Sequence, residues 1–485
     1  MKKFQIFTVT FIFFILIAPF SVFGQFITFE KHIGQSSSDH GYYVQQTNDS
    51  GYIITGSTIV PASGRADDVY LVKTNSNGDT IWTKAFGGTS YDGGLSVQQT
   101  SDNGFIVVGY LSQLQIIYLL KTDSIGRFMW SKEYNMGYHG SATSVKELPN
   151  GQYIVAGFCS DTCGIVMKIN SVGDTIWTRK LCTGYQYFSD VEIVNDSEYV
   201  VVGRKAMHTV IYKFDINGEM QWEKIDSSSF ASVARSVAKT SDNGFIVVGY
   251  TSTCEADSCY DIYLSKYSTN GNVEWKKVIG VPNVYEEGMS VEQTVDGGYF
   301  IAGTKRTTYN SRVCIIKTDN MGDTLWTRLY GSQADNNYTN AHSAQQTFDG
   351  GYIITGTIRY SNPNAGTDVY LLKVNENGLL PVVENQENLP LQFSLSQNYP
   401  NPFNPITVIS FSLPVTSNAT VKVYNILGQE VATLINNKEL HVGNHEVEFD
   451  ASKLSSGLYF YKLTAHQGES STGEFSQVKR MILLK

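Results

Sequence analysis

The hydrophobic pattern along most of the chain repeats in units of four short β-type segments. One unit reads LSVQQT, GFIVVGY, IIYLLKT and FMWSKEY. Turns rich in Asn, Asp and Gly join the first segment to the second and the third to the fourth, as tight hairpins require. The second and third segments are nearly continuous apolar runs, which is typical of strands buried on both faces. The pattern therefore predicts repeated antiparallel sheets of four strands.

A glycine near the end of the second segment fixes the period. The stretch TSDNGFIVVGY occurs at 100–110 and again at 240–250. Aligned copies are spaced 46 to 54 residues apart, at Gly56, Gly109, Gly157, Gly203, Gly249, Gly303 and Gly356. A constant period of this length indicates a repeat architecture. Sheets stacked around an axis bury both faces of each sheet, so we predict an all-β fold that begins with a seven-bladed β-propeller.

Two further residue types recur with the same period. Each of the six tryptophans stands four residues after a turn glycine, as Trp82 follows Gly78. We expect these tryptophans on the outermost strands, where they fill the gap between diverging sheets, while the repeated second-strand glycine permits close approach further in. A lysine precedes each turn glycine by five residues, at Lys73, Lys121, Lys168, Lys213, Lys266, Lys317 and Lys373. These lysines are either a polyanion site or, the interpretation we favour, local pairs within each sheet.

The seventh repeat lacks its fourth segment, because LLPVVENQENLP with a proline and no tryptophan follows Gly378. The N-terminal sequence FITFEKHIGQSSSDHGYYVQQT aligns without gaps to the sequence from Thr80, with Phe29 at the tryptophan position. We therefore expect the N-terminal segment to supply the missing strand and close the ring.

The first residues carry an export signal. Lys2 and Lys3 precede an unbroken apolar run with small residues near Gly24, which is typical of a signal peptide. No other segment is apolar for long enough to predict a membrane span. We expect a signal peptide at 1–24, a propeller at 25–378, a linker at 379–392 and a separate domain at 393–485. The net charge of −9 argues against a nucleic acid partner.

The C-terminal segments read as a small antiparallel, immunoglobulin-like sandwich. This region resembles the type A C-terminal sorting domain of the bacterial type IX secretion system. The matching residues are Pro400, Asn401, Pro402 and Phe403, then Tyr424, Asn425, Gly428 and Val431, then 454–459, then the terminal strand from Lys479 and Arg480 to Lys485. The resemblance implies export through the inner membrane, recognition by the outer-membrane translocon and removal of the tail by a sortase-like peptidase. The product would be extracellular or attached to the cell surface.

The cysteines fit an oxidising compartment. Cys159 and Cys163 flank one loop, and Cys254 and Cys259 flank the corresponding loop two repeats later. Local disulfides across these loops are one possibility. Hairpin register places Cys182 opposite Cys163, so a bond between these two is an open alternative. Cys314 lies in an apolar strand, where we expect a buried thiol.

The sequence contains no recognised catalytic, nucleotide-binding or zinc motif. Calcium binding by the Asp-rich turns is disfavoured, because their spacing matches no known calcium loop. We therefore expect neither a metal nor a cofactor, and a non-catalytic binding or adhesion module rather than an enzyme. The alternative is a secreted polysaccharide hydrolase or lyase with carboxylates at the channel mouth.

The connections that vary from repeat to repeat predict the binding face. Second-to-third and fourth-to-first connections differ in every repeat and emerge on one rim, where a rigid scaffold concentrates binding residues. Aligned there are aromatic and acidic residues that suit a glycan or protein ligand: Tyr91, Asp92, His139, Tyr285, Glu286, Glu287 and Tyr338. The competing interpretation is that these tyrosines only pack between loops.

Overall fold

The computed structural model describes residues 27–34, 38–60, 67–88, 90–111, 116–136, 140–159, 162–195, 197–227, 231–252, 260–281, 284–307, 310–331, 337–361, 366–380, 392–415, 417–440, 443–466 and 475–485. Every regular element within these ranges is a β-strand. The chain divides into two compact units, Met1–Pro381 and Val382–Lys485. The expected signal peptide at 1–24 lies outside the described residues.

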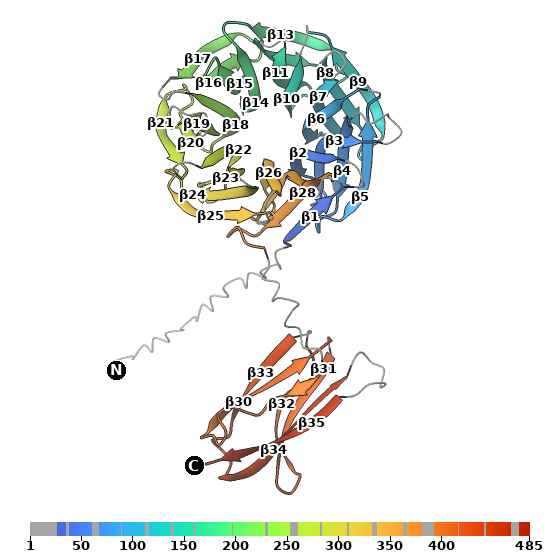
Figure 1. Ribbon diagram of the computed structural model, residues 1–485, viewed down its shortest axis with the longest axis vertical. Coiled ribbons are helices and arrows are strands. Elements are labelled where there is room, and N and C mark those ends of the chain that lie inside the picture. The colour runs from blue at the N-terminus through green and yellow to red at the C-terminus, as the bar shows by residue number, and fades with distance from the viewer. Residues whose placement is uncertain are drawn as a thin grey trace, which may run out of the picture. The chain divides into compact units, whose positions relative to one another are not determined.

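Five sheets of the N-terminal unit each pair four consecutive strands in chain order (Figure 1). They comprise β2 (Asp39–Gln46), β3 (Tyr52–Ile59), β4 (Asp67–Thr74) and β5 (Thr80–Phe86); β6 (Asp92–Gln99), β7 (Phe105–Leu111), β8 (Ile116–Thr122) and β9 (Phe128–Tyr134); β10 (Ser141–Glu147), β11 (Tyr153–Cys159), β12 (Cys163–Ile169) and β13 (Thr175–Leu181); β14 (Gln186–Asn195), β15 (Glu198–Lys205), β16 (His208–Asp215) and β17 (Met220–Asp226); β18 (Ser232–Lys239), β19 (Phe245–Ser252), β20 (Tyr260–Tyr267) and β21 (Val273–Ile279).

A sixth sheet holds eight strands. They are β22 (Tyr285–Gln293), β23 (Tyr299–Arg306), β24 (Ser311–Thr318), β25 (Thr324–Tyr330), β26 (Tyr338–Gln346), β27 (Tyr352–Arg359), β28 (Thr367–Val374) and β1 (Phe29–Ile33). A single parallel residue pair, Ser311 with Tyr338, joins β24 to β26, and all other pairs in this sheet are antiparallel. The unit is therefore built from repeated four-stranded antiparallel arrays in a propeller-like arrangement, as the repeat pattern predicts.

The arrays stand around a central opening, with β2, β6, β10, β14, β18, β22 and β26 innermost (Figure 1). The second and third strands of each array are almost wholly buried, in agreement with their apolar sequence; Phe105 to Val108 are at most 1% exposed. Separate apolar clusters occupy the spaces between neighbouring arrays. Each array thus buries both faces against its neighbours.

The N-terminal strand pairs as the alignment predicts. All five residues of β1 pair antiparallel with β28, from Phe29 opposite Lys373 to Ile33 opposite Val369. The Phe29 ring lies against Gly78, whose φ of 73° is in the left-handed region. The tryptophans behave in the same way, since Trp82 lies against Gly126 and Trp326 against Gly378. A side chain on these glycines would collide with the ring, so glycine here serves both the turn and the packing between arrays.

The recurrent lysines pair locally, which confirms the interpretation favoured above. Lys121 is buried, and its Nζ lies 2.9 Å from Asp102 Oδ2 and 3.1 Å from the Thr122 carbonyl oxygen. Six of the seven have an acidic partner on the preceding turn or strand: Lys73–Asp49, Lys121–Asp102, Lys213–Glu198, Lys266–Asp242, Lys317–Asp296 and Lys373–Asp349. Lys168 instead donates to the Ile216 carbonyl at 3.4 Å, and burial lowers its pKa. The lysines do not form a polyanion site.

A disulfide joins Cys163 to Cys182, so the register-based alternative is correct and Cys159 is not the partner of Cys163. Cys314 is buried, and burial together with the nearby Glu286 carboxylate raises the pKa of its thiol to about 12. Cys254 and Cys259 lie outside the described residues.

The C-terminal unit contains two antiparallel sheets around one apolar core. One sheet orders β29 (Ser394–Leu395), β30 (Ile406–Leu413) and β33 (Gly443–Asp450). The other orders β32 (Glu430–Leu440), β31 (Ser417–Asn425), β34 (Gly457–His466) and β35 (Phe475–Leu483). Alternate residues of β31 and β34 point into the core, as expected when one face of a sheet is buried.

The Pro-Asn-Pro-Phe segment of this unit binds the last strand. Asn401 Oδ1 accepts a hydrogen bond from the Ile482 amide at 2.9 Å. The Phe403 amide donates to the Ile482 carbonyl, and the Leu484 amide donates to the Phe403 carbonyl, both at 3.0 Å. The outer edge of β35 is therefore partly covered by a segment about eighty residues earlier in the chain.

The other sorting-motif residues lie in or beside the sheet that contains β35. Tyr424 lies in β31 and precedes the turn at Gly428, whose φ is 75°. Gly457 opens β34 and pairs with Leu483, while Lys479 and Arg480 pair with Tyr461 and Phe460. The motif residues are thus concentrated on β31, β34 and β35 and their turns.

Candidate functional site

Each innermost strand contains a β-bulge at the same position. In β6, Gly94 pairs with Gly109 and Ser96 pairs with Val108, which leaves Leu95 without a partner in the register. The other six strands shift register at the equivalent residue. The seven bulged residues, here called the bulge ring, are Tyr42, Leu95, Thr143, Ser189, Arg235, Met289 and His342. A bulge redirects a side chain relative to its strand, which is a common device beside functional sites.

The repeated second-strand glycine exists because of this bulge. A Cβ atom on Gly109 would lie 1.8 Å from the carbonyl oxygen of Gly93, just before the bulge. The equivalent glycines face the same backbone oxygen of their own arrays, for example Gly356 and the Asn340 carbonyl. Only glycine fits, so the residue that defines the sequence period is the one that accommodates the bulge.

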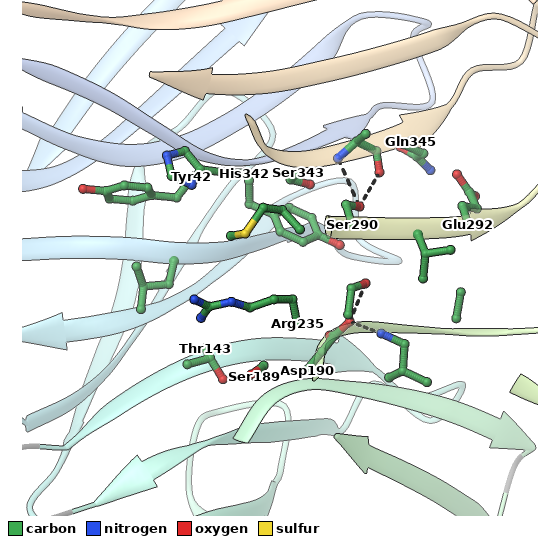
Figure 2. A pocket seen from close by; sticks show the side chains of 18 of the residues that line it. Tyr42, Thr143, Ser189, Asp190, Arg235, Ser290, Glu292, His342, Ser343 and Gln345 are labelled. Carbon is green, nitrogen blue, oxygen red and sulfur yellow. Dashed lines mark hydrogen bonds between the residues drawn. The ribbon is translucent and has the colours of Figure 1, made fainter. Parts of the chain in front are cut away.

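All seven members of the bulge ring line one cavity at the centre of the unit (Figure 2). Its volume is about 320 Å³, at the lower end of the range for small-molecule sites. A different residue type occupies each of the seven positions, and together they supply aromatic, apolar, hydroxyl and guanidinium groups. The cavity is therefore asymmetric although the scaffold is repeated.

An aromatic group lines one side of the cavity. The rings of Tyr42 and His342 meet edge to face with centroids 5.4 Å apart, and His40 stacks on the other side of Tyr42 at 5.9 Å. Burial, together with the positive charges of His40, Arg235 and Arg306, lowers the pKa of His342 to about 4. His342 is therefore neutral at physiological pH.

Arg235 supplies a positive charge to the bulge ring. Its Cζ lies 5.4 Å from the centre of the Tyr250 ring, and its Nη2 lies 3.9 Å from Glu287 Oε2. Its Nε is buried and makes no hydrogen bond with the part of the chain that the structure describes. Arg235 is thus held mainly by an aromatic ring and by a long ion pair.

A second layer, one residue further along each strand, is mostly serine. Serine occupies this place at Ser96, Ser144, Ser236, Ser290 and Ser343, and the two exceptions are Tyr43 and Asp190. Asp190 joins its neighbours, because it accepts hydrogen bonds from the Ser144 hydroxyl at 2.7 Å and the Ser236 hydroxyl at 3.1 Å. Burial is the main cause of the raised pKa of Tyr43, and the carboxylates of Asp190, Glu192 and Glu292 add to it.

A third layer, two residues beyond the second layer on each strand, links neighbouring arrays. Gln45 accepts a hydrogen bond from the Gln99 amide at 2.6 Å, and Gln345 accepts one from the Gln46 amide at 2.8 Å. Lys146 and Glu192 form an ion pair of 3.0 Å in this layer. These contacts tie β2 to β6, β26 to β2 and β10 to β14.

Glu292 is the unusual member of the third layer. Burial raises the pKa of its carboxyl to about 7, although the Gln346 amide donates a hydrogen bond to it at 2.6 Å and the charge of Lys146 also favours ionisation. The carboxylate of Glu192 opposes ionisation. A carboxyl group near half-ionisation at neutral pH is therefore present on the cavity wall.

The residues predicted on the variable rim come from several arrays. Tyr91 is 58% exposed, whereas Asp92 is buried at the start of β6. Tyr338 opens β26 opposite Arg359. His139 lies outside the described residues. These positions belong to different arrays, so the rim hypothesis for them stays a prediction.

The rim residues of β22 make defined contacts. Glu286 is buried, pairs with Lys305 at 2.7 Å and accepts a hydrogen bond from the Val281 amide. Tyr285 donates to Glu287 at 3.1 Å, and the Arg306 guanidinium lies over the Tyr285 ring. Because Glu287 also faces Arg235, this part of the rim is connected to the cavity.

Sequence reasoning missed the bulge ring, although a signal for it exists. Each member stands fourteen residues before the repeated glycine, as Tyr42 does before Gly56. The residue at this position differs in every repeat, whereas similar residues recur on either side of it.

No group of three or more potential metal ligands occurs among the described residues. The same residues include no helix long and apolar enough to cross a membrane.

Comparison with known proteins assigns the C-terminal unit. Residues 397–475 match the family model of the secretion system C-terminal sorting domain. None of the curated proteins matches the chain at a significant level.

Several solved structures are similar to the chain at low identity. One, described as the extracellular domain of a hybrid two component system from B. thetaiotaomicron, is 12% identical with a TM-score of 0.47 over 95% of this chain and 60% of that one. The Pan2 WD40 domain of Neurospora crassa is 11% identical with a TM-score of 0.45 over 70% of this chain and 88% of that one. These similarities assign no ligand or activity. The sorting domain, by contrast, shows that the chain interacts with the type IX secretion machinery and is exported to the cell surface or the extracellular space.

Proposed function

We propose that the N-terminal unit is a seven-bladed β-propeller closed by β1, and that the C-terminal unit is an immunoglobulin-like sandwich. One observation supports the blade count and a second supports closure of the ring. The eight-stranded sheet has only one residue pair between β24 and β26, so it reads as two blades. The Gln345 side chain of β26 bonds the Gln46 amide of β2, which joins the last blade to the first.

We further propose that the propeller is a non-catalytic binding module for an extracellular glycan or protein, and that its cavity receives part of that ligand. The observation that carries this proposal is the bulge ring. A geometry repeated seven times directs a different side chain from each blade into one cavity of about 320 Å³. Packing alone would favour the same residue in every blade, so the variation is best explained by an asymmetric ligand. The sortase-like peptidase implied by the tail would process the exported chain.

A substitution that fills the cavity tests the proposal. Neither Met289 nor Leu95 has a side-chain hydrogen bond to lose, and we expect Met289→Trp to occupy part of the cavity and abolish binding on glycan and matrix-protein arrays. Met321→Trp is the matched control, because Met321 lies in an exposed turn on the outer side of the unit and is 55% exposed. The proposal fails if both variants bind like the unmodified protein.

The rim prediction is tested on the same arrays. Alanine at Tyr91, Tyr285 and Tyr338 together should weaken binding if the ligand extends from the cavity onto the rim. Loss of binding in this triple variant, with Met289→Trp unaffected, would move the site from the cavity to the rim.

One observation favours the alternative of a polysaccharide hydrolase or lyase. Glu292, with its pKa near 7, could donate a proton, while Asp190 on the same cavity wall carries a second carboxyl group. The test is incubation with polysaccharides and measurement of new reducing ends or unsaturated products. Activity that disappears in Glu292→Gln would establish the enzyme and refute the non-catalytic proposal.

A further inference from the structure

Arg235 enters the cavity with its charge only partly compensated. Its side chain is 30% exposed, and in Figure 2 it lies between the pair Tyr42–His342 and the pair Thr143–Ser189. Its buried Nε cannot be reached from the cavity, so the Nη groups are the donors that a ligand would meet.

The carboxylate nearest to Arg235 is already bound elsewhere. Glu287 accepts a hydrogen bond from Arg306 Nη2 at 3.3 Å and another from the Tyr285 hydroxyl at 3.1 Å. The distance from Glu287 to Arg235 is 3.9 Å, beyond a hydrogen bond. Two guanidinium groups thus share one carboxylate, which leaves one positive charge among the three groups. Arg235 therefore offers its charge to an anion at the bulge ring. The carboxylates of the cavity, Asp190, Glu192 and Glu292, lie in the second and third layers, where Lys146 pairs with Glu192.

The neighbouring groups suit the hydroxyls of a sugar. The Thr143 hydroxyl donates to the Phe188 carbonyl at 2.9 Å, and the Ser189 hydroxyl donates to the Ala234 carbonyl at 2.8 Å. Their single protons are used, so both oxygens can only accept hydrogen bonds from a ligand. Tyr42 offers an aromatic ring on the other side. The site therefore presents an anion-binding group, hydroxyl acceptors and an aromatic ring.

We propose that the ligand carries a uronic acid residue and that the Nη groups of Arg235 bind its carboxylate. This inference rests on the proposed binding function of the cavity. A sugar is compatible with the available space, because a cavity of about 320 Å³ accommodates one or two sugar rings. The ring that carries a uronate carboxylate also carries hydroxyl donors for Thr143 and Ser189, whereas an ionised acidic side chain has no donor and a peptide would have to supply backbone N–H groups.

The experiment compares uronate oligosaccharides with their carboxyl-reduced counterparts by calorimetry on the full chain. We expect the acidic sugar to bind about tenfold to a hundredfold more tightly, as a charge-assisted hydrogen bond to a carboxylate would give. Arg235→Gln should remove the difference, and Arg235→Lys should retain part of it. Arg328→Gln is the matched control, because Arg328 carries the same charge but packs on Trp326 of the outermost strand.

Melting curves of all variants establish that they fold. Equal affinity for the acidic and the reduced sugar overturns the inference and leaves a glycan-binding function intact. Preference for a glutamate-terminated peptide over any sugar also overturns it. A protein that binds no sugar or protein on the arrays refutes both the inference and the proposed function.

Discussion

The closing strand β1 gives the sharpest test of the ring architecture. Deletion of residues 25–34 removes β1 and leaves β28 with an unpaired edge. Phe29 and Ile33, both partly buried against the apolar cluster beside β2, lose their contacts. The Tyr370 hydroxyl, which is fully buried, loses its 2.7 Å hydrogen bond to Glu30.

The loss can be estimated from these contacts. Two half-buried apolar side chains contribute about 1 kcal/mol each, and a hydrogen bond to a charged group contributes about 1.5–3 kcal/mol, so the deletion should cost roughly 3–5 kcal/mol. An unfolding entropy of about 2.1 cal/mol/K per residue gives about 0.8 kcal/mol/K for a unit of this length. We therefore expect the melting temperature of the propeller to fall by about 4–6 °C.

Scanning calorimetry of the deletion variant measures this fall, and two point variants separate its causes. Glu30→Gln keeps an oxygen acceptor for Tyr370 and should change stability little. Glu30→Ala leaves the hydroxyl unpaired and should cost about 1–3 kcal/mol. An unchanged melting temperature after the deletion would refute the closure by β1.

Three further predictions concern titration. Burial raises the pKa of the Glu292 carboxyl from 4.5 to about 7, so the stability that its bound proton contributes is present below pH 4.5 and is lost as the pH rises to 7. Glu292→Gln should therefore raise the melting temperature at pH 8 but not at pH 4. Because burial lowers the pKa of His342 from 6.5 to about 4, stability should fall as the pH drops from 6.5 to 4, and NMR should show a neutral ring at pH 5.5. Burial opposes ionisation of Asp242, but hydrogen bonds from Lys266 and Thr240 lower its pKa to about 2, so its contribution is lost between pH 3.8 and 2; a melting temperature of Asp242→Asn that matches the unmodified protein at pH 7 would contradict the role of the Lys266 pair.

The strand pairing was predictable because it depends on residues that recur. The alignment that placed Phe29 at the tryptophan position also predicted the pairing of β1 with β28, and the hairpin register offered the Cys163–Cys182 disulfide as one of two open alternatives. The lysine column was interpreted correctly for the same reason, since its acidic partners recur on the preceding turns. Local spacing was enough for the disulfide and the lysine pairs, because these partners lie within one repeat, whereas the pairing of β1 with β28 required the alignment of repeats at opposite ends of the unit.

The cavity was not predictable in this way. Its lining comes from strands spread over three hundred residues, and one added residue in each strand reverses the direction expected from simple alternation. Because every repeat contains the same extra residue, the bulge produces no insertion or gap when the repeats are aligned. The loops drew attention instead, because they vary in length as well as in sequence.

The repeated glycine was recognised in the sequence, and its structural cause is the bulge, which the sequence analysis did not predict. The bulge geometry requires the glycine, because any Cβ atom there would meet the backbone of the bulged strand. The bulged residue has no partner in the strand register, and a different residue occupies this position in each blade. Constant geometry with a variable residue at one position distinguishes the scaffold from the proposed site. Under the binding function proposed above, the asymmetry of the cavity, including the guanidinium of Arg235, serves the ligand.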